Sequence, residues 1–229
     1  MKELGIDLTT QREMTGISHM AETIVLNSKD VEIFKYQGIS YKTKKYNEST
    51  FDNIIIKNDT EKEYYKRFKN FCKNFEELKE KGIGILLQGS EGTGKTLYSY
   101  AISNELDKKY KVYRTPLSFY LDDIKTDFDE KYYLNLVKEA DLLIINDIGN
   151  ESLKDWAMER VYNLLNTAYE EKISLIIDTN LDDQQLENFL NIRGSSKLMS
   201  RLKAKCKKFV FDWEDRRVNE NKEYFEKYF

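Results

Sequence analysis

A short apolar run that breaks into glycines and ends on a lysine and a threonine carries the clearest chemistry of this sequence. It reads LLQGSEGTGKT over residues 86–96 and fits the pattern G-x-x-x-x-G-K-[ST]. In such a loop the backbone N–H groups wrap an anionic phosphate, and the following helix adds a favourable dipole. Lys95 would reach the β- and γ-phosphates of a nucleotide, and the Thr96 hydroxyl would ligate Mg²⁺. A glycine-rich turn that binds nothing is the alternative. The predicted nucleotide contacts in this loop are Gly89, Ser90, Glu91, Gly92, Thr93, Gly94, Lys95, Thr96 and Leu97.

A second apolar run, DLLIINDIGNE at 141–151, offers the carboxylate that orients a metal in phosphoryl transfer. Asp147 stands just past the expected strand, where the ligands of open α/β sheets collect, although Asp is also a common turn residue. Asn146 precedes it, at a position where a second carboxylate is expected. We therefore expect Thr96, Asn146 and Asp147 to form a weak metal site with slow hydrolysis, which Asn146→Asp should accelerate.

A third run, SLIIDTN at 174–180, ends on Asn180. The carboxyl ends of parallel strands meet at one edge of a sheet, so this amide should lie near the phosphate-binding loop and could orient the attacking water. Asn is also a common turn former just past a strand. The residue taken alone supports both interpretations equally.

The elements that must position these groups follow from apolar periodicity. Alternating apolar runs and helical stretches predict an α/β fold, with a parallel sheet covered by helices on both faces. A capping box at Thr60 and Glu63 predicts one amphipathic helix that ends at Gly82. The predicted strands are 83–88, 111–115, 141–146, 173–178 and 208–211, and the later helices are 95–107, 117–125, 131–139, 152–170 and 182–190.

Composition limits the possible classes of protein. The 229 residues carry 37 basic and 40 acidic side chains, so the chain is not a polycation that coats nucleic acid unaided. One histidine, His19, and two distant cysteines, Cys72 and Cys206, make a zinc site and a disulfide framework not credible and argue against a Ser-His-Asp hydrolase. No apolar run approaches the ~18 residues of a membrane span. A cytoplasmic protein without membrane contact is expected.

The motifs together resemble the DnaC and DnaI helicase loaders and the related IstB ATPases of the AAA+ class. The loop at 86–96 resembles their Walker A motif, DLLIINDIGNE their Walker B strand, and LIIDTNLD at 175–182 their sensor 1 strand. SSKLMSRLKAKCKKFVFDWEDRR at 195–217 resembles the arginine-finger helix, the last strand and the terminal arginine. The resemblance covers about residues 46–217, with the motifs in the family's order.

This resemblance implies ATP and Mg²⁺ as cofactors and a P-loop NTPase fold (AAA+/ASCE) with a five-stranded parallel sheet. Asp147 would be the catalytic carboxylate of Walker B, and Asn180 the sensor. Arg201 would be an arginine finger that reaches the γ-phosphate of a neighbouring subunit. Arg217 would be the sensor 2 arginine, although Arg216 beside it is an equal candidate.

The resemblance also implies a division of the chain. Residues 1–46 would be a small N-terminal segment that binds a replicative hexameric DNA helicase. Residues 47–229 would be the AAA+ ATPase domain, without a full helical lid, which forms a homo-oligomer on single-stranded DNA. The run at 193–217 holds nine basic side chains against three acidic ones, which suits a DNA contact or an ordinary solvated face.

Other functions stay open at this point. An IstB-like transposition ATPase shares the same core motifs. A non-hydrolysing adaptor switched by ATP is favoured by Asn146, and a small P-loop kinase is disfavoured because no acceptor-site motif is evident. The sequence leaves open whether the gene belongs to a host or a phage.

Overall fold

A five-stranded parallel sheet runs through the protein, with strand order β2-β3-β4-β1-β5. The computed structural model describes residues 28–126, 130–149, 155–191, 195–219 and 222–229. The predicted parallel α/β sheet is confirmed, and each predicted strand begins within two residues of an observed one. The strands are β1 Gly84–Gly89, β2 Val112–Pro116, β3 Leu142–Ile148, β4 Ser174–Thr179 and β5 Cys206–Phe211.

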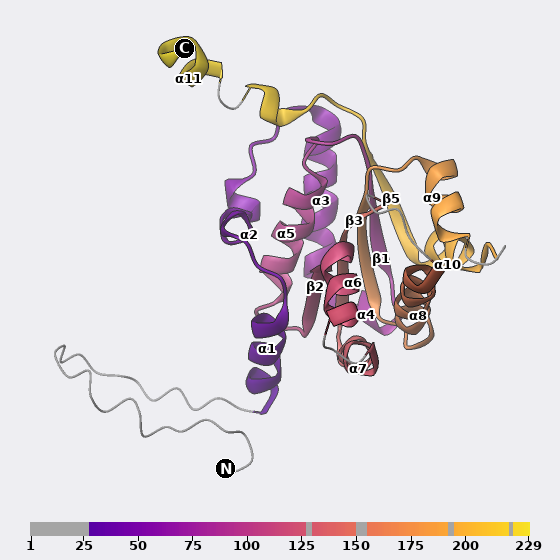
Figure 1. The fold of residues 1–229 in the computed structure, drawn as a ribbon. Coiled ribbons are helices and arrows are strands. Elements are labelled where there is room, and N and C mark those ends of the chain that lie inside the picture. Colours follow the sequence, from indigo (N-terminus) through magenta and orange to yellow (C-terminus); the bar gives the residue numbers. More distant parts are fainter. Residues whose placement is uncertain (1–27, 127–129, 150–154, 192–194, 220–221) are drawn as a thin grey trace, which may run out of the picture.

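Helices cover both faces of the sheet, as the apolar runs require (Figure 1). On one face of the sheet, Ile144 and Ile176 share a hydrophobic core with Phe68 and Ile102. Ile145 belongs to the core on the other face. The helices are α1 Ser28–Ile39, α2 Lys44–Glu48, η2 Phe51–Asn53, α3 Asp59–Lys73, α4 Phe75–Glu80, α5 Lys95–Leu106, α6 Leu117–Thr126, α7 Glu130–Glu139, α8 Asp155–Glu170, α9 Asp183–Leu190, α10 Lys197–Lys205, η3 Arg216–Asn219 and α11 Lys222–Tyr228.

The helix predicted from Thr60 to Gly82 is two helices. Asn58 caps α3, and its side chain accepts a hydrogen bond from the backbone N–H of Glu61 at 2.7 Å. The predicted capping box at Thr60 is therefore wrong by two positions. Asn74 then leaves the helical conformation, so α3 ends there and α4 begins. Apolar residues recur at helical spacing on both sides of this break, so the periodicity of the sequence did not reveal where α3 ends.

Residues 28–46 pack against the helices and the sheet of the α/β fold. Helix α1 buries Ile33 and Tyr36, and the Tyr36 hydroxyl donates to the backbone oxygen of Leu136 at 2.7 Å. The predicted boundary at residue 46 remains a prediction. Residues 1–27 of the predicted partner-binding segment lie outside the described part of the chain.

The segment after α1 covers the outer edge of β2. Ser40 Oγ donates to the Val112 oxygen at 2.9 Å and accepts the Arg114 N–H at 3.1 Å. The Tyr41 N–H donates to the Arg114 oxygen at 2.9 Å. These bonds satisfy backbone groups of β2 on the side that faces away from β3.

Candidate nucleotide-binding site

The glycine-rich loop connects β1 to α5, as predicted from its flanking patterns. Gly92 and Gly94 have φ angles of 72° and 102°, in the region that favours glycine. A side chain at Gly92 would also collide with the Asp215 carboxylate, and a Cβ at Gly94 would lie 3.2 Å from Arg216 Nε. The loop is thus fixed both by its own torsions and by the chain that follows β5.

The Lys95 ammonium lies at the centre of this loop. It donates to the backbone oxygens of Gly89 and Ser90, each at 2.7 Å, and its side chain is buried. Burial lowers the pKa of Lys95, and the carboxylates of Asp178 and Asp147 oppose that shift. A bound phosphate would replace these carbonyl oxygens with charged acceptors, which hold an ammonium more strongly.

A cleft of about 580 Å³ opens beside the loop and gathers most of the predicted site residues. It follows the carboxyl ends of the strands, where ligands of parallel sheets bind. Its size suits a small organic ligand. The predicted residues that line it are Glu91, Gly92, Gly94, Lys95, Thr96, Leu97, Asp147, Asn180 and Arg217, together with the alternative Arg216.

Asp147 lies across this cleft from the loop, at a φ angle of 58° that is costly for any residue with a side chain. Burial and the nearby Glu91 carboxylate raise its pKa, and Lys95 opposes them. The Thr96 hydroxyl and the Asp147 carboxylate are hard oxygen donors and suit Mg²⁺. Among the described residues there is no cluster of three or more acidic, His or Cys side chains for a metal. The donor set therefore fits a metal held largely by phosphates and water.

Asn146 does not line the cleft. Its side chain is 1% exposed, and its amide nitrogen donates to Asp178 Oδ2 at 2.7 Å and to Ser99 Oγ at 2.9 Å. The Asp147 N–H donates to the other oxygen, Asp178 Oδ1, at 2.6 Å. A metal contact by Asn146 remains a prediction that these contacts do not support.

Asp178 is the residue of this site that sequence reasoning missed. It is fully buried on β4, and burial raises its pKa to about 6. The signal was present in the sequence: a carboxylate inside the apolar run SLIIDT needs hydrogen-bond partners when it is buried, and Asn146 lies in the neighbouring apolar run.

The two candidate sensor 2 arginines have different surroundings. Arg217 is exposed and pairs with Asp215, with Nη2 and Oδ2 3.0 Å apart. Arg216 is buried, pairs with Glu61, and donates its backbone N–H to the Gly92 oxygen at 3.0 Å. Both line the cleft, so the geometry leaves the choice between them open.

Asn180 reaches the same cleft from the end of β4. Its amide nitrogen lies 3.5 Å from Glu91 Oε1, which belongs to the phosphate-binding loop. The predicted sensor residue therefore faces the phosphate-binding loop, and its role as a sensor remains a prediction.

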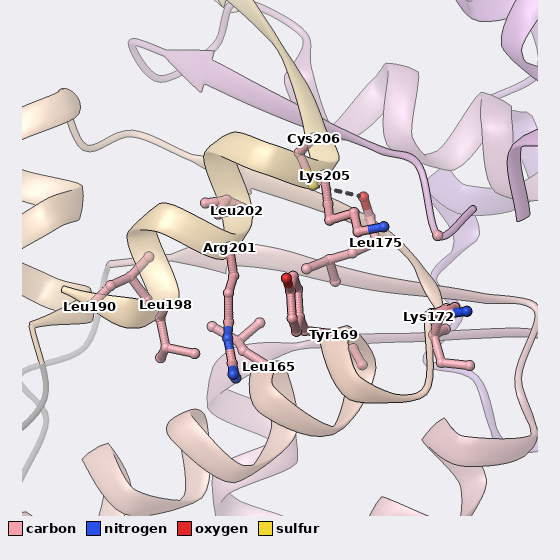
Figure 2. A pocket seen from close by; sticks show the side chains of 13 residues that line it. Leu165, Tyr169, Lys172, Leu175, Leu190, Leu198, Arg201, Leu202, Lys205 and Cys206 are labelled. Carbon is pink, nitrogen blue, oxygen red and sulfur yellow. Dashed lines mark hydrogen bonds between the residues drawn. The ribbon is translucent and has the colours of Figure 1, made fainter. Parts of the chain in front are cut away.

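Arg201 lies at the opposite edge of the sheet, since α10 ends where β5 begins, and Cys206 pairs in register with Gly84 at the start of β1. Figure 2 shows its guanidinium beside the ring of Tyr169, whose centroid is 4.4 Å away. Nη2 pairs with Glu170 at 2.8 Å. Arg201 therefore does not line the cleft of its own chain, and its role as a finger that acts on a neighbouring subunit remains a prediction.

The basic run at 193–217 does not form one continuous patch in the described part of the chain. Lys203 pairs with Glu187 at 3.5 Å, and Lys208 pairs with Asp183 at 2.7 Å. Intramolecular partners thus neutralise part of this charge, and residues 192–194 are outside the described ranges. Contact with single-stranded DNA remains a prediction.

Comparison with known proteins shows which family the sequence matches. Residues 74–223 match the family model described as IstB-like ATP binding protein. The replicative helicase loader DnaI of Bacillus subtilis is 26% identical over 182 residues, which cover 74% of this chain and 58% of that protein. The replicative helicase loader DnaC of Buchnera aphidicola is 24% identical over 180 residues, which cover 76% of this chain and 72% of that protein. The chain spans about three fifths of the length of the first of these relatives.

Solved structures agree on the fold. A crystal structure of the DnaC helicase loader superposes with a TM-score of 0.63 at 24% identity, covering 73% of this chain and 99% of that one. A crystal structure of DnaI gives a TM-score of 0.65 at 20% identity, covering 80% of this chain and 100% of that one. The predicted AAA+ P-loop fold is confirmed. None of the described helices is long and apolar enough to cross a membrane.

Proposed function

Because the chain belongs to the family of IstB-like ATP binding proteins, we propose that it is a helicase-loader ATPase, which places a hexameric replicative helicase on single-stranded DNA. The observation that carries this proposal is the cleft itself. The loop lysine and threonine, Asp147, Asn180 and the two arginines converge there from separate parts of the chain. These are the groups that phosphoryl transfer uses to hold a nucleotide and position water.

Each group has a distinct task in this proposal. Lys95 leaves the carbonyl oxygens of its own loop and binds the β- and γ-phosphates. Thr96 and Asp147 would hold Mg²⁺, which neutralises charge that develops on the phosphates. Asn180 would orient the attacking water. Arg201 would complete the site of a neighbouring copy, so that turnover requires a homo-oligomer.

The proposed partner rests on the relatives. DnaI and DnaC are named replicative helicase loaders, and both align over about three quarters of this chain. The family model favours a second candidate, an IstB-like ATPase that assists a transposase. The ATP site is common to both functions, so the partner must distinguish them.

The ATP site is tested by calorimetry on Lys95→Ala. Each lost charge-assisted bond should weaken ATP binding about tenfold or more. The matched control is Lys138→Ala, because this lysine is exposed on α7, away from the cleft. Equal ATP affinity in wild type and Lys95→Ala would refute the assignment of the loop.

Loading is tested with the replicative helicase of the same genome on closed circular single-stranded DNA that carries an annealed oligonucleotide. A ring-shaped helicase must be opened to enter a closed circle, so release of the oligonucleotide should require this protein and ATP. No stimulation of the helicase, together with ATP-dependent stimulation of a transposase, would support the second candidate instead.

A further inference from the structure

The buried contact between Asn146 and Asp178 unites two adjacent strands beneath the nucleotide cleft. Ile145 pairs in register with Ile177, and the two polar residues follow at the next position of β3 and β4. Asn146 donates to Asp178 at 2.7 Å, and the Asp147 N–H donates to Asp178 at 2.6 Å. The Asp178 carboxylate thus accepts a hydrogen bond on each of its oxygens.

A full negative charge at this depth needs a function, because burying an ion costs several kcal/mol even when it is paired. The nucleotide site has one negative charge fewer than is usual for phosphoryl transfer. Phosphoryl transfer with Mg²⁺ uses a carboxylate at the end of this strand, and Asn146 is neutral. Asp178 is also the charged group that most strongly favours the ammonium form of Lys95.

We propose that Asp178 on β4 supplies the negative charge that Asn146 on β3 lacks, and that it positions Asp147 for the metal through the backbone bond. This inference rests on the proposed ATPase function. Asp178 is a positioning residue, since it is fully buried and does not line the cleft. The amide lies on β3 and the carboxylate on β4, so the pair has one charge and one donor.

The contact with Asp178 explains why an amide suits position 146. Its NH₂ group donates to a carboxylate, which a second carboxylate could not do. Two buried carboxylates this close repel each other, so that one takes up a proton or the contact breaks. Asn146→Asp alone should therefore impair the protein, in contrast to the faster hydrolysis expected from sequence.

A strand swap tests the proposal. In the double variant Asn146→Asp/Asp178→Asn the new amide donates back to the new carboxylate, and its oxygen still accepts the Asp147 N–H. The charge and these two hydrogen bonds are conserved, whereas the bond that Asn146 donates to Ser99 Oγ would require the hydroxyl to donate instead. The control for a change from carboxylate to amide is Asp122→Asn, on an exposed position of α6.

Three quantities are measured. They are the Tm without nucleotide, the Mg²⁺ concentration at which ATP binding reaches half of its maximal affinity, and the steady-state rate of phosphate release from ATP. Each single variant should lower Tm by about 5–10 °C. Below that Tm, Asp178→Asn should raise the half-saturating Mg²⁺ concentration about tenfold, because the site loses one charge. The double variant should recover both quantities and at least half of the phosphate release.

Two results would overturn the inference. If Asp178→Asn changes Tm but leaves the Mg²⁺ dependence and turnover of the wild type, the pair has a structural role only. If the double variant is no better than the weaker single variant, the two residues are not exchangeable. Failure of the wild type to bind ATP would instead refute the proposed function, which keeps the two failures distinct.

Discussion

The buried ion pair between Glu61 and Arg216 connects helix α3 to the phosphate-binding loop, and its loss should be costly. Glu61 is fully buried and also accepts bonds from the Tyr98 hydroxyl at 2.9 Å and from the Lys57 N–H at 2.8 Å. Arg216 donates its backbone N–H to Gly92. One carboxylate thus holds three donors, from Lys57 just before α3, Tyr98 on α5 and Arg216 on η3.

The substitution Glu61→Ala leaves the Arg216 cation buried without its counter-ion. Breaking a buried pair in this way costs about 3–5 kcal/mol. For a chain of this size, 1 kcal/mol corresponds to about 2–4 °C, so Tm should fall by about 6–20 °C. ATP affinity should also fall, because Arg216 lines the cleft and braces the loop.

The assay is thermal unfolding followed by circular dichroism, with Glu63→Ala as the matched control. Glu63 lies on the same helix and forms an exposed pair with Arg67, which should contribute no more than about 0.5 kcal/mol. A double variant with leucine at positions 61 and 216 should recover part of the loss, since it leaves no buried charge. If Glu61→Ala and Glu63→Ala unfold at the same temperature, the energetic argument for this pair is wrong.

Three further outcomes are expected. Arg201→Ala should keep ATP affinity in calorimetry but lose turnover and ATP-dependent assembly in sedimentation, and a monomer with full turnover would contradict the role in a neighbouring site. Removal of residues 1–27 should end helicase capture and keep ATP binding, whereas removal of residues 1–46 should also lower Tm because buried tyrosines of α1 and α2 are lost. Both cysteines, Cys72 and Cys206, are partly buried, and burial raises the pKa values of their thiols to about 12, so at pH 8 a disulfide reagent should label the native protein much more slowly than the unfolded protein, and equal labelling rates would contradict this expectation.

The sequence predicted the sheet well because its strands are apolar runs bounded by glycine, proline or charge, and a run buried on both faces is hard to mistake. Helix α1 was not predicted, because it buries only Ile33 and Tyr36 and so shows no apolar stripe. Its place on the fold depends on contacts with residues about a hundred positions later, such as Leu136. The local sequence pattern of a helix cannot predict contacts with residues so far along the chain.

The site was predicted as far as its motifs reach. The loop and Asp147 follow from spacing, and both line the same cleft. Asp178 could not be recognised from spacing alone, since its partner Asn146 belongs to another strand. Register between β3 and β4 decides that contact, and register follows from the assembled sheet.

The bonds that Ser40 and Tyr41 make along β2 have a consequence for solubility. β2 is an edge strand, and an open edge is a template on which another chain can add a strand and aggregate. This short segment occupies the outward groups of β2 before a second molecule can. Cutting the chain after residue 46 would uncover that edge, so self-association of such a fragment in the absence of ATP would report strand pairing.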